Sequence, residues 1–379
     1  MNPYEELATL LRPAGGGLFL VSTGRAEQIE LQKTIYGAAT EEEVGQKWRA
    51  ALAEIAAAKV VILGAPSDVG AGFLRGANMG PQAIRQELLK AKKTGGGLPA
   101  GVVDAGDVFV VPQLLHDDML APAQREASAR ALYPGVEPAV RASLPVSPLS
   151  ILERAIDLLF AINPKVVPIV LGGDHSCAWP VSAALARARA ASVNPANPAK
   201  PAKPAWGIVQ MDAHTDLLEE RLGIRYCFAT WSYHASRLLA RPDHMVQVGI
   251  RATRHPRAHW ENDVGVRQFW ADECNRDPAA AIDAIVEHLL ARGIESIYFS
   301  NDIDGTDDQF ADATGTPEPH GLQPDFVLGL IHRLGKEFHL CAGDIMEVAP
   351  PIPRYPGGTE RTVALAAQYI TETITAALR

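Results

Sequence analysis

The stretch WGIVQMDAHTD, residues 206–216, joins an apolar run to three ionisable side chains at alternate positions. Residues 206–211 are typical of a buried strand in an α/β sheet. Side chains two residues apart in an extended chain point the same way, so Asp212, His214 and Asp216 can converge on one point. Ionisable groups crowded at the end of a buried strand need an opposite charge between them. The stretch therefore predicts a divalent metal ion at the end of this strand.

Two further segments repeat this arrangement. The apolar run 166–171 leads into GGDHS at 172–176, and the run 296–300 leads into NDID at 301–304. Each segment alone is also typical of loop capping residues. In open parallel sheets, however, ligands bind at the carboxyl ends of strands, so the three segments together predict one crevice. Six ligands, four of them carboxylates, suit two divalent ions that share bridging carboxylates. The predicted ligands are His175, Asp212, His214, Asp216, Asp302 and Asp304.

Helix-like periods alternate with strand-like runs along most of the chain. Helices are expected at 149–162, 177–190, 278–291, 324–335 and 360–377. Strands are expected at 59–64, near 102–107, and near 166–171, 206–211, 245–250, 296–301 and 338–345. This alternation predicts an α/β protein with a three-layer, doubly wound and mostly parallel sheet that carries helices on both faces.

Composition and charge exclude several classes of partner. The 379 residues are 47% hydrophobic, enough for a large core, and the net charge of −9 argues against nucleic acid or an anionic membrane as a partner. No apolar run approaches the length of a membrane span. The four cysteines, at 177, 227, 274 and 341, show neither CxxC pairing nor framework spacing. We therefore expect free thiols in a reducing compartment and a cytoplasmic protein.

The motifs resemble those of the ureohydrolase (arginase/agmatinase) family. GGDHS, DAHTD and SNDIDGTDD at 300–308 are similar to its three signature motifs, and the resemblance runs from about Val60 to the C-terminus. GAGFLRGANMGP at 70–81, TGTPEPHGL at 314–322 and AGDIMEVAP at 342–350 also resemble family segments. The resemblance implies an arginase-like fold, all six metal ligands, and two divalent ions, manganese or nickel. It also implies a homo-oligomer, either a trimer or a hexamer.

The resemblance also divides the chain. Residues 1–58 form an N-terminal extension that is expected to be partly helical, with Thr40 as the N-cap of a helix that starts at Glu41. Residues 59–379 are then the ureohydrolase catalytic domain. The Pro/Ala-rich segment 191–204 is expected to be a surface insert between the first and second motifs.

The implied reaction is hydrolysis of a guanidino C–N bond with release of urea. Asp216 is expected to accept a proton from the attacking water while binding metal. Glu347 is expected to hold the substrate guanidinium, the alternative being a capping or salt-bridging glutamate. Many relatives carry a His-Gly-Thr segment after the second motif, where this chain has Phe228-Ala229-Thr230. His234 is therefore either a shifted general acid or a loop histidine without a chemical task.

The segment after the second motif also bears on the substrate. Residues 217–220, LLEE, replace the asparagine and serine of the arginase pattern, which argues against arginine. We expect Thr230, Trp231 and Glu347 to bind the substrate, within an aromatic wall to which Tyr226, Phe228 and Tyr233 also contribute. The long extension resembles the guanidine-hydrolysing branch of the family. These features favour guanidine, a small cation, as the substrate, with urea and ammonia as products.

Three alternatives remain open from the sequence. The chain could be an agmatinase or a guanidino-acid ureohydrolase. It could be a non-catalytic, metal-binding regulatory subunit, because the His-Gly-Thr segment is missing. It could also be a single-zinc amidohydrolase of the deacetylase type, although such sites contain fewer carboxylates.

Overall fold

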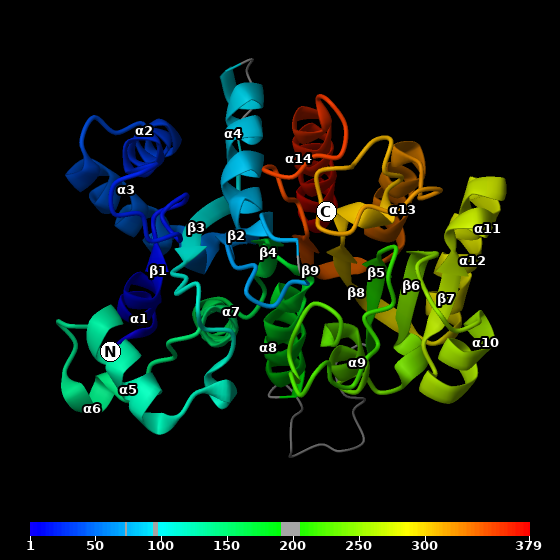
Figure 1. Ribbon diagram of the computed structural model, residues 1–379, viewed down its shortest axis with the longest axis horizontal. Coiled ribbons are helices and arrows are strands. Elements are labelled where there is room, and N and C mark those ends of the chain that lie inside the picture. The colour runs from blue at the N-terminus through cyan, green and yellow to red at the C-terminus, as the bar shows by residue number, and fades with distance from the viewer. Residues whose placement is uncertain (73, 94–97, 191–204) are drawn as a thin grey trace.

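The computed structural model describes residues 1–72, 74–93, 98–190 and 205–379. Within these ranges one nine-stranded sheet forms the centre of the molecule, in the order β1-β3-β2-β4-β9-β8-β5-β6-β7 (Figure 1). All neighbouring strands are parallel except β1 and β3, which are antiparallel. The strands are β1 (Leu11–Arg12), β2 (Val60–Gly64), β3 (Val102–Val108), β4 (Val167–Leu171), β5 (Ala205–Met211), β6 (Met245–Ile250), β7 (Arg267–Trp270), β8 (Ile294–Asn301) and β9 (His339–Ile345).

Helices cover both faces of this sheet, as the alternation of elements predicted. The first face carries α7 (Pro148–Ile162), α8 (Ala178–Ala190) and α9 (Trp231–Ser236). The other carries α4 (Gly80–Lys93), α12 (Pro278–Ala291), α13 (Pro324–Glu337) and α14 (Gly358–Ala377). The remaining α-helices are α1 (Pro3–Leu10), α2 (Arg25–Tyr36), α3 (Glu41–Ala53), α5 (Pro122–Leu132), α6 (Pro138–Arg141), α10 (Arg257–His259) and α11 (Ala271–Arg276).

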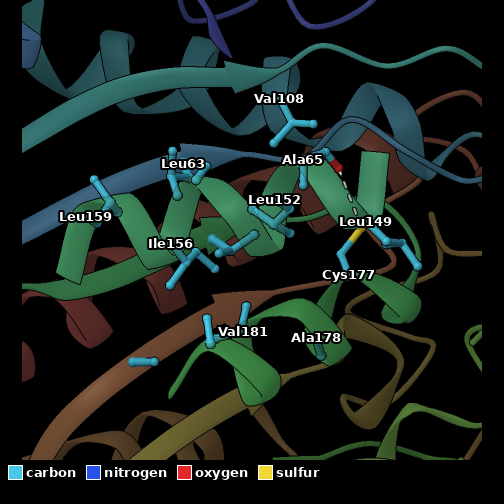
Figure 2. Packing of buried hydrophobic residues seen from close by; sticks show 14 of the residues in the cluster. Leu63, Ala65, Val108, Leu149, Leu152, Ile156, Leu159, Cys177, Ala178 and Val181 are labelled. Carbon is cyan, nitrogen blue, oxygen red and sulfur yellow. Dashed lines mark hydrogen bonds between the residues drawn. The ribbon is translucent and has the colours of Figure 1, made fainter. Parts of the chain in front are cut away.

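The strands are apolar on both sides because both faces of the sheet are covered. Successive residues of β2 alternate between two buried clusters: Val61 and Leu63 belong to the first, and Val60 and Ile62 to the second. Figure 2 shows the first cluster, in which side chains of α7 lie between Leu63 and α8. The continuous apolar runs in the sequence therefore correspond to central strands of a three-layer fold.

Two strands and the insert fall outside the sequence-based scheme. β1 has only two residues and β7 has four, and neither forms an apolar run long enough to predict a strand. The expected insert at 191–204 lies outside the described residues. The other expected strands and helices agree with the structure to within two residues at each end, and α12 has the expected bounds.

The N-terminal extension is joined to the sheet. Thr40 begins α3 as predicted, because its side chain accepts a hydrogen bond from the amide of Glu43 at 3.2 Å. Asp107 in β3 accepts hydrogen bonds from the amides of Gly15 at 2.8 Å and Gly17 at 3.2 Å. The same carboxylate forms an ion pair with the buried Arg85 of α4. One buried acid therefore ties the extension to the core.

None of the helices in the described ranges combines the length and apolar composition needed to cross a bilayer.

Removing this acid should destabilise the fold. In Asp107→Ala, Arg85 would lose one of its two carboxylate partners and remain buried, so we expect a loss of about 3–5 kcal/mol. Urea unfolding followed by circular dichroism measures the change. The matched control is Glu126→Ala, which removes an exposed ion pair with Arg130 and should cost less than about 1 kcal/mol. Equal losses in the two variants would contradict the assigned role of Asp107.

Candidate metal centre

Four neighbouring strands deliver the candidate site. In the sheet order β4-β9-β8-β5 these strands run parallel, so their carboxyl ends lie side by side. The first motif follows β4, the second follows β5 and the third follows β8. Glu347 follows β9, between the first and third motifs. The topology therefore brings segments about 170 residues apart in the chain to one edge of the sheet.

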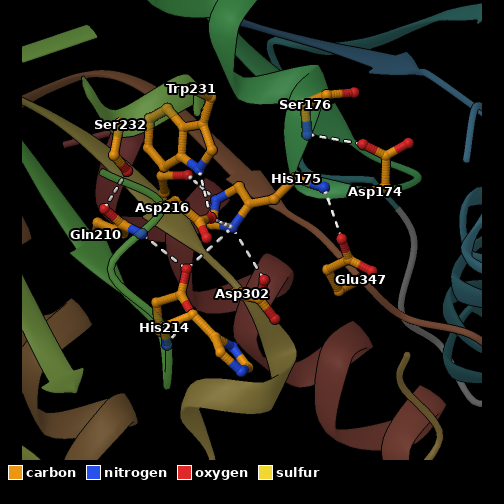
Figure 3. Close-up of polar contacts among 12 residues, drawn as sticks. Asp174, His175, Ser176, Gln210, His214, Asp216, Trp231, Ser232, Asp302 and Glu347 are labelled. Atoms are coloured by element: carbon orange, nitrogen blue, oxygen red, sulfur yellow. Dashed lines mark hydrogen bonds and ion pairs between the residues drawn. The ribbon is translucent and has the colours of Figure 1, made fainter. Parts of the chain in front are cut away.

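The first group of candidate ligands surrounds the ring of His175. Its Nδ1 lies 2.9 Å from Oδ2 of Asp302, 3.1 Å from Oδ2 of Asp212 and 3.4 Å from Oδ2 of Asp216. Figure 3 shows this ring among the carboxylates. His175, Asp212 and Asp216 offer ligand atoms that all lie within 4.8 Å of one another, a spacing that a metal ion could bridge.

The second group shares one residue with the first. Nδ1 of His214 lies 3.1 Å from Oδ2 of Asp304 and 3.6 Å from Oδ1 of Asp212. These three residues form a second cluster able to hold a metal ion. Asp212 therefore directs one carboxylate oxygen to each group. Together the two groups contain all six residues that the sequence predicted as ligands.

Local backbone geometry fixes two of the acids. Oδ1 of Asp212 accepts a hydrogen bond from the amide of His214 at 2.6 Å, and Oδ1 of Asp302 accepts one from the amide of Asp304 at 2.9 Å. Such turns are favoured when aspartate follows a strand. Asp216 has a φ of +51°, in the left-handed region that few residues other than glycine adopt. The strained backbone turns this carboxylate back toward the others.

The electrostatics of the two groups call for added positive charge. Burial lowers the pKa of His175, but Asp212 and Asp302 raise it well above its usual value. Burial and the charge of Asp212 raise the pKa of Asp216, and burial and the charge of Asp304 raise that of Asp302. Four carboxylates facing two imidazoles cannot all be ionised at neutral pH without further cations. Divalent ions would remove that conflict.

The two nitrogens of His175 have different surroundings. Nδ1 makes no hydrogen bond to any described residue, although it is fully buried beside carboxylate oxygens. Nε2 lies 3.0 Å from Oγ of Ser300, which in turn donates to the buried Asp344 at 3.0 Å. This contact can hold the Nε2 proton and leave the lone pair of Nδ1 for a metal. Polar residues inside the apolar runs of β8 and β9 were the sequence signal for this support.

Asp304 and His214 also have partners that the sequence analysis missed. Oγ1 of Thr316 donates to Oδ2 of Asp304 at 2.9 Å, and Oε1 of Glu318 lies 3.8 Å from Nε2 of His214. Arg251, the residue after β6, donates to the backbone carbonyls of Asp304 at 2.7 Å and Glu318 at 2.8 Å. The 314–318 segment is therefore attached to the third motif on the side of the second group.

Thr230 and Trp231 do not present a surface to a substrate in this structure. Both are fully buried. Oγ1 of Thr230 closes a local turn by hydrogen bonding to the carbonyl of Arg225 and the amide of Cys227. Nε1 of Trp231 donates to Oδ2 of Asp216 at 3.0 Å, and its ring lies 4.6 Å from that of His175. Trp231 therefore supports a candidate metal ligand, in a position different from the expected aromatic wall.

Two of the other expected wall residues, Tyr226 and Tyr233, pack around His234, and Phe228 has a different neighbour. Tyr226 is buried and stacks on Trp179 with ring centres 4.7 Å apart. Phe228 is half-buried and lies beneath the guanidinium of Arg221. His234 has its Nε2 2.9 Å from the carbonyl oxygen of Glu219. Its ring also packs against three aromatic side chains, Trp179, Tyr226 and Tyr233. None of these contacts within the described chain joins His234 to a candidate metal ligand.

Glu347 lies beside the first group, at the end of β9. Its Oε1 accepts a hydrogen bond from the backbone amide of His175 at 2.9 Å (Figure 3). Its Oε2 points toward Gly315. A β-carbon placed on Gly315 would lie 3.7 Å from this oxygen. The φ of Glu347, +62°, is also left-handed. Burial and the charge of Asp174 raise its pKa well above its usual value, so a nearby cationic substrate would favour the ionised form.

Comparisons with known proteins agree with this geometry. The sequence model of the arginase family matches residues 58–375. The chain is 27% identical over 308 residues to guanidinobutyrase of Pseudomonas aeruginosa, covering 79% of this chain and 81% of that protein. It is 31% identical over 303 residues to proclavaminate amidinohydrolase of Streptomyces clavuligerus, covering 77% and 80%. The solved structure of proclavaminate amidinohydrolase from that organism matches with a TM-score of 0.63 and 27% identity, over 84% of this chain and 91% of the other.

The match extends over most of the chain and includes all three motifs at the carboxyl edge of the sheet, so the chain belongs to the arginase family.

Proposed function

We propose that this arginase-family chain hydrolyses a guanidino C–N bond and releases urea, with free guanidine as the favoured substrate. The observation that carries the proposal is the position of Asp212 between two groups of metal-ligand type, with Glu347 beside them. His175, Asp212, Asp216 and Asp302 would hold one divalent cation. Asp212, His214 and Asp304 would hold a second. The ligand set is rich in oxygen and contains two imidazoles, which suits manganese or nickel.

Charge balance supports two ions. Four carboxylates match the charge of two divalent cations, and the buried Nδ1 of His175, which makes no hydrogen bond to a described residue, supplies a donor atom beside three of them. When bound, two such cations would supply the Lewis acidity that makes water a nucleophile near neutral pH. The protein's own part is to hold the guanidinium over this centre and to carry protons.

Glu347 is the proposed guanidinium carboxylate. The amide of His175 fixes Oε1, so Oε2 keeps one direction toward Gly315 and can accept from a guanidinium N–H. The left-handed φ of Glu347 costs of order 1–3 kcal/mol of conformational free energy. Such strain is typical of functional positions. The hydrogen bond and the strained backbone together give the carboxylate a fixed orientation, which favours one approach of the planar substrate.

Asp216 is the proposed proton carrier. Trp231 donates to its Oδ2, which holds the carboxylate in place and leaves Oδ1 to accept the proton of the attacking water. The same oxygen can then return that proton to the leaving amine. The contacts of His234 with Glu219 and three aromatic rings favour the reading of a loop histidine over that of a general acid.

Low exposure of the first group and of Glu347 supports a small substrate, although His214 of the second group is 27% exposed. Glu347 is 6% exposed, Asp216 7% and His175 0%. Guanidine fits this confinement better than a long guanidino compound does. The relatives that are named for guanidinobutyrate and proclavaminate support a guanidino acid as the second candidate, and agmatine, a guanidino amine, stays a further alternative. A trimer or hexamer stays a prediction from the family resemblance, testable by light scattering of the purified chain.

A substrate panel tests the reaction. The metal-free chain, loaded with manganese or nickel, should release urea fastest from guanidine, compared with agmatine, guanidinobutyrate and arginine. Urea is measured directly, and bound metal is counted by elemental analysis. Equal and negligible rates on all four compounds with two ions bound would contradict the proposal and favour a regulatory subunit. One metal ion per chain with no urea would favour the deacetylase type.

Removing a ligand of the second group should remove one of the two proposed metal ions and leave the other bound. In Asp304→Ala we expect bound metal to fall from two ions to one per chain, and urea release to fall at least about 100-fold. Asp308→Asn is the matched control, because Asp308 contacts Arg354 and Tyr355 and no member of either group. Unchanged metal content in Asp304→Ala would contradict the assignment.

Neutralising the guanidinium carboxylate should spare the metals. In Glu347→Gln the side chain keeps an oxygen for the amide of His175 but loses its charge. A hydrogen bond to a charged group contributes about 1.5–3 kcal/mol, so kcat/KM should fall about 10- to 150-fold. Bound metal should stay at two ions. Glu337→Gln, in an ion pair with Arg333 on α13, is the control and should leave kcat/KM unchanged.

A further inference from the structure

Three glutamines lie side by side inside the sheet. Gln210 of β5 is in register with Gln247 of β6, and Gln247 is in register with Gln268 of β7. All three side chains are fully buried. Their neighbours along the strands, such as Val246, Val248 and Phe269, are apolar and belong to the cluster on the opposite face of the sheet. We call Gln210, Gln247 and Gln268 the glutamine ladder.

The ladder forms an unbroken chain of hydrogen bonds that ends on Asp212. Nε1 of Trp270 donates to Oε1 of Gln268 at 2.9 Å, and Nε2 of Gln268 donates to Oε1 of Gln247 at 2.8 Å. Nε2 of Gln247 donates to Oε1 of Gln210 at 2.8 Å. Nε2 of Gln210 donates to Oδ2 of Asp212 at 2.7 Å. The chain therefore connects the far edge strand of the sheet to the carboxylate shared by both ligand groups.

The two ends fix the direction of every bond. An indole N–H can only donate, and an ionised carboxylate can only accept. With Trp270 at one end and Asp212 at the other, each amide must point its N–H toward Asp212. The amide dipoles are then aligned head to tail, and hydrogen bonds in such a chain strengthen one another. The positive end of the ladder meets the carboxylate.

Two branches attach the ladder to the rest of the second motif. Nε2 of Gln247 also donates to the carbonyl oxygen of Thr215 at 2.5 Å. Oγ of Ser232 donates to Oε1 of Gln210 at 2.5 Å, as Figure 3 shows. Ser232 follows Trp231, whose indole donates to Asp216. The ladder therefore bonds to the side chain of Asp212 and the backbone of Thr215. Through Ser232 it also lies next to Trp231, the partner of Asp216.

Apolar side chains at these positions would avoid a free-energy cost, because burying an amide is unfavourable unless all its hydrogen bonds are made. We propose that the glutamine ladder positions Asp212, so that Oδ2 is held from the sheet side while Asp212 spans the two metal positions. Gln210, Gln247 and Gln268 are positioning residues of the metal centre. The inference rests on the proposed function only in taking Asp212 as the shared ligand.

Metal binding by ladder variants tests the proposal without turnover. Manganese is titrated into the metal-free full chain by calorimetry for Gln210→Met, Gln247→Met and Gln268→Met. Loss of an outer partner of a ligand weakens metal binding about 10- to 100-fold, so we expect that loss at Gln210. The loss should become smaller through Gln247 to Gln268. Gln268→Met, the most distant change, keeps the test available if Gln210→Met does not fold.

A buried glutamine outside the ladder provides the control. Gln28 of α2 is 1% exposed, donates to the carbonyl of Leu18 at 3.0 Å and accepts from Arg25 at 2.8 Å. Gln28→Met removes a similar buried amide and should leave both manganese affinities unchanged. Unfolding of the metal-free variants should show stability losses that do not follow the order of the affinity losses, because the side chains of Gln210 and Gln247 each make three hydrogen bonds.

Two outcomes would overturn the proposal. The first is that Gln247→Met and Gln268→Met bind two manganese ions with wild-type affinities. The second is that Gln28→Met weakens binding as much as the ladder variants do. Failure of the wild-type chain to release urea would overturn the proposed function instead, and it would leave the affinity series intact. The two hypotheses therefore fail in different measurements.

Discussion

The crowding of four aspartates around two imidazoles at one edge of the sheet is the constraint on which the site depends. Parallel neighbours β4, β9, β8 and β5 end together, so groups from distant segments meet without a long connecting loop. Each acid is held by a backbone amide, a hydroxyl or an indole before any ion is considered. The fold thus assembles negative charge that water cannot reach easily, and divalent cations would offset it.

Much of the candidate metal centre could be predicted because its signal is local. The end of an apolar run marks a strand end, and a parallel sheet brings such ends together, so the three motifs could be placed at one edge. The extended spacing expected for Asp212, His214 and Asp216 does not hold, because the chain bends after Asp212 and Asp216 has a φ of +51°. Thr230 and Trp231 could not be placed in this way. The segment that carries them turns back on itself, with the amide of Leu218 bonded to the carbonyl of Ala229 at 3.1 Å. That path depends on contacts between residues far apart in the chain.

The supports behind the ligands were hidden for a related reason. The three glutamines of the ladder become neighbours only through the register of β5, β6 and β7. That register cannot be predicted from the sequence alone. A polar residue inside an apolar run was the visible trace, as it was for Ser300 and Asp344. Such residues destabilise a core unless hydrogen-bond partners are present. They therefore mark positions where a polar side chain orients a functional group instead of packing as an apolar one would.

The short strand β1 has a consequence for how copies of the chain meet. It pairs with the last residues of β3. Nε1 of Trp48 donates to the carbonyl of Ala105, which comes earlier in the same strand. Without these contacts a seven-residue strand would stand at the margin of the sheet with its backbone groups open to another molecule. The extension therefore shields the sheet from edge-to-edge polymerisation. Its first residues cover part of this strand's edge as well as adding to the core.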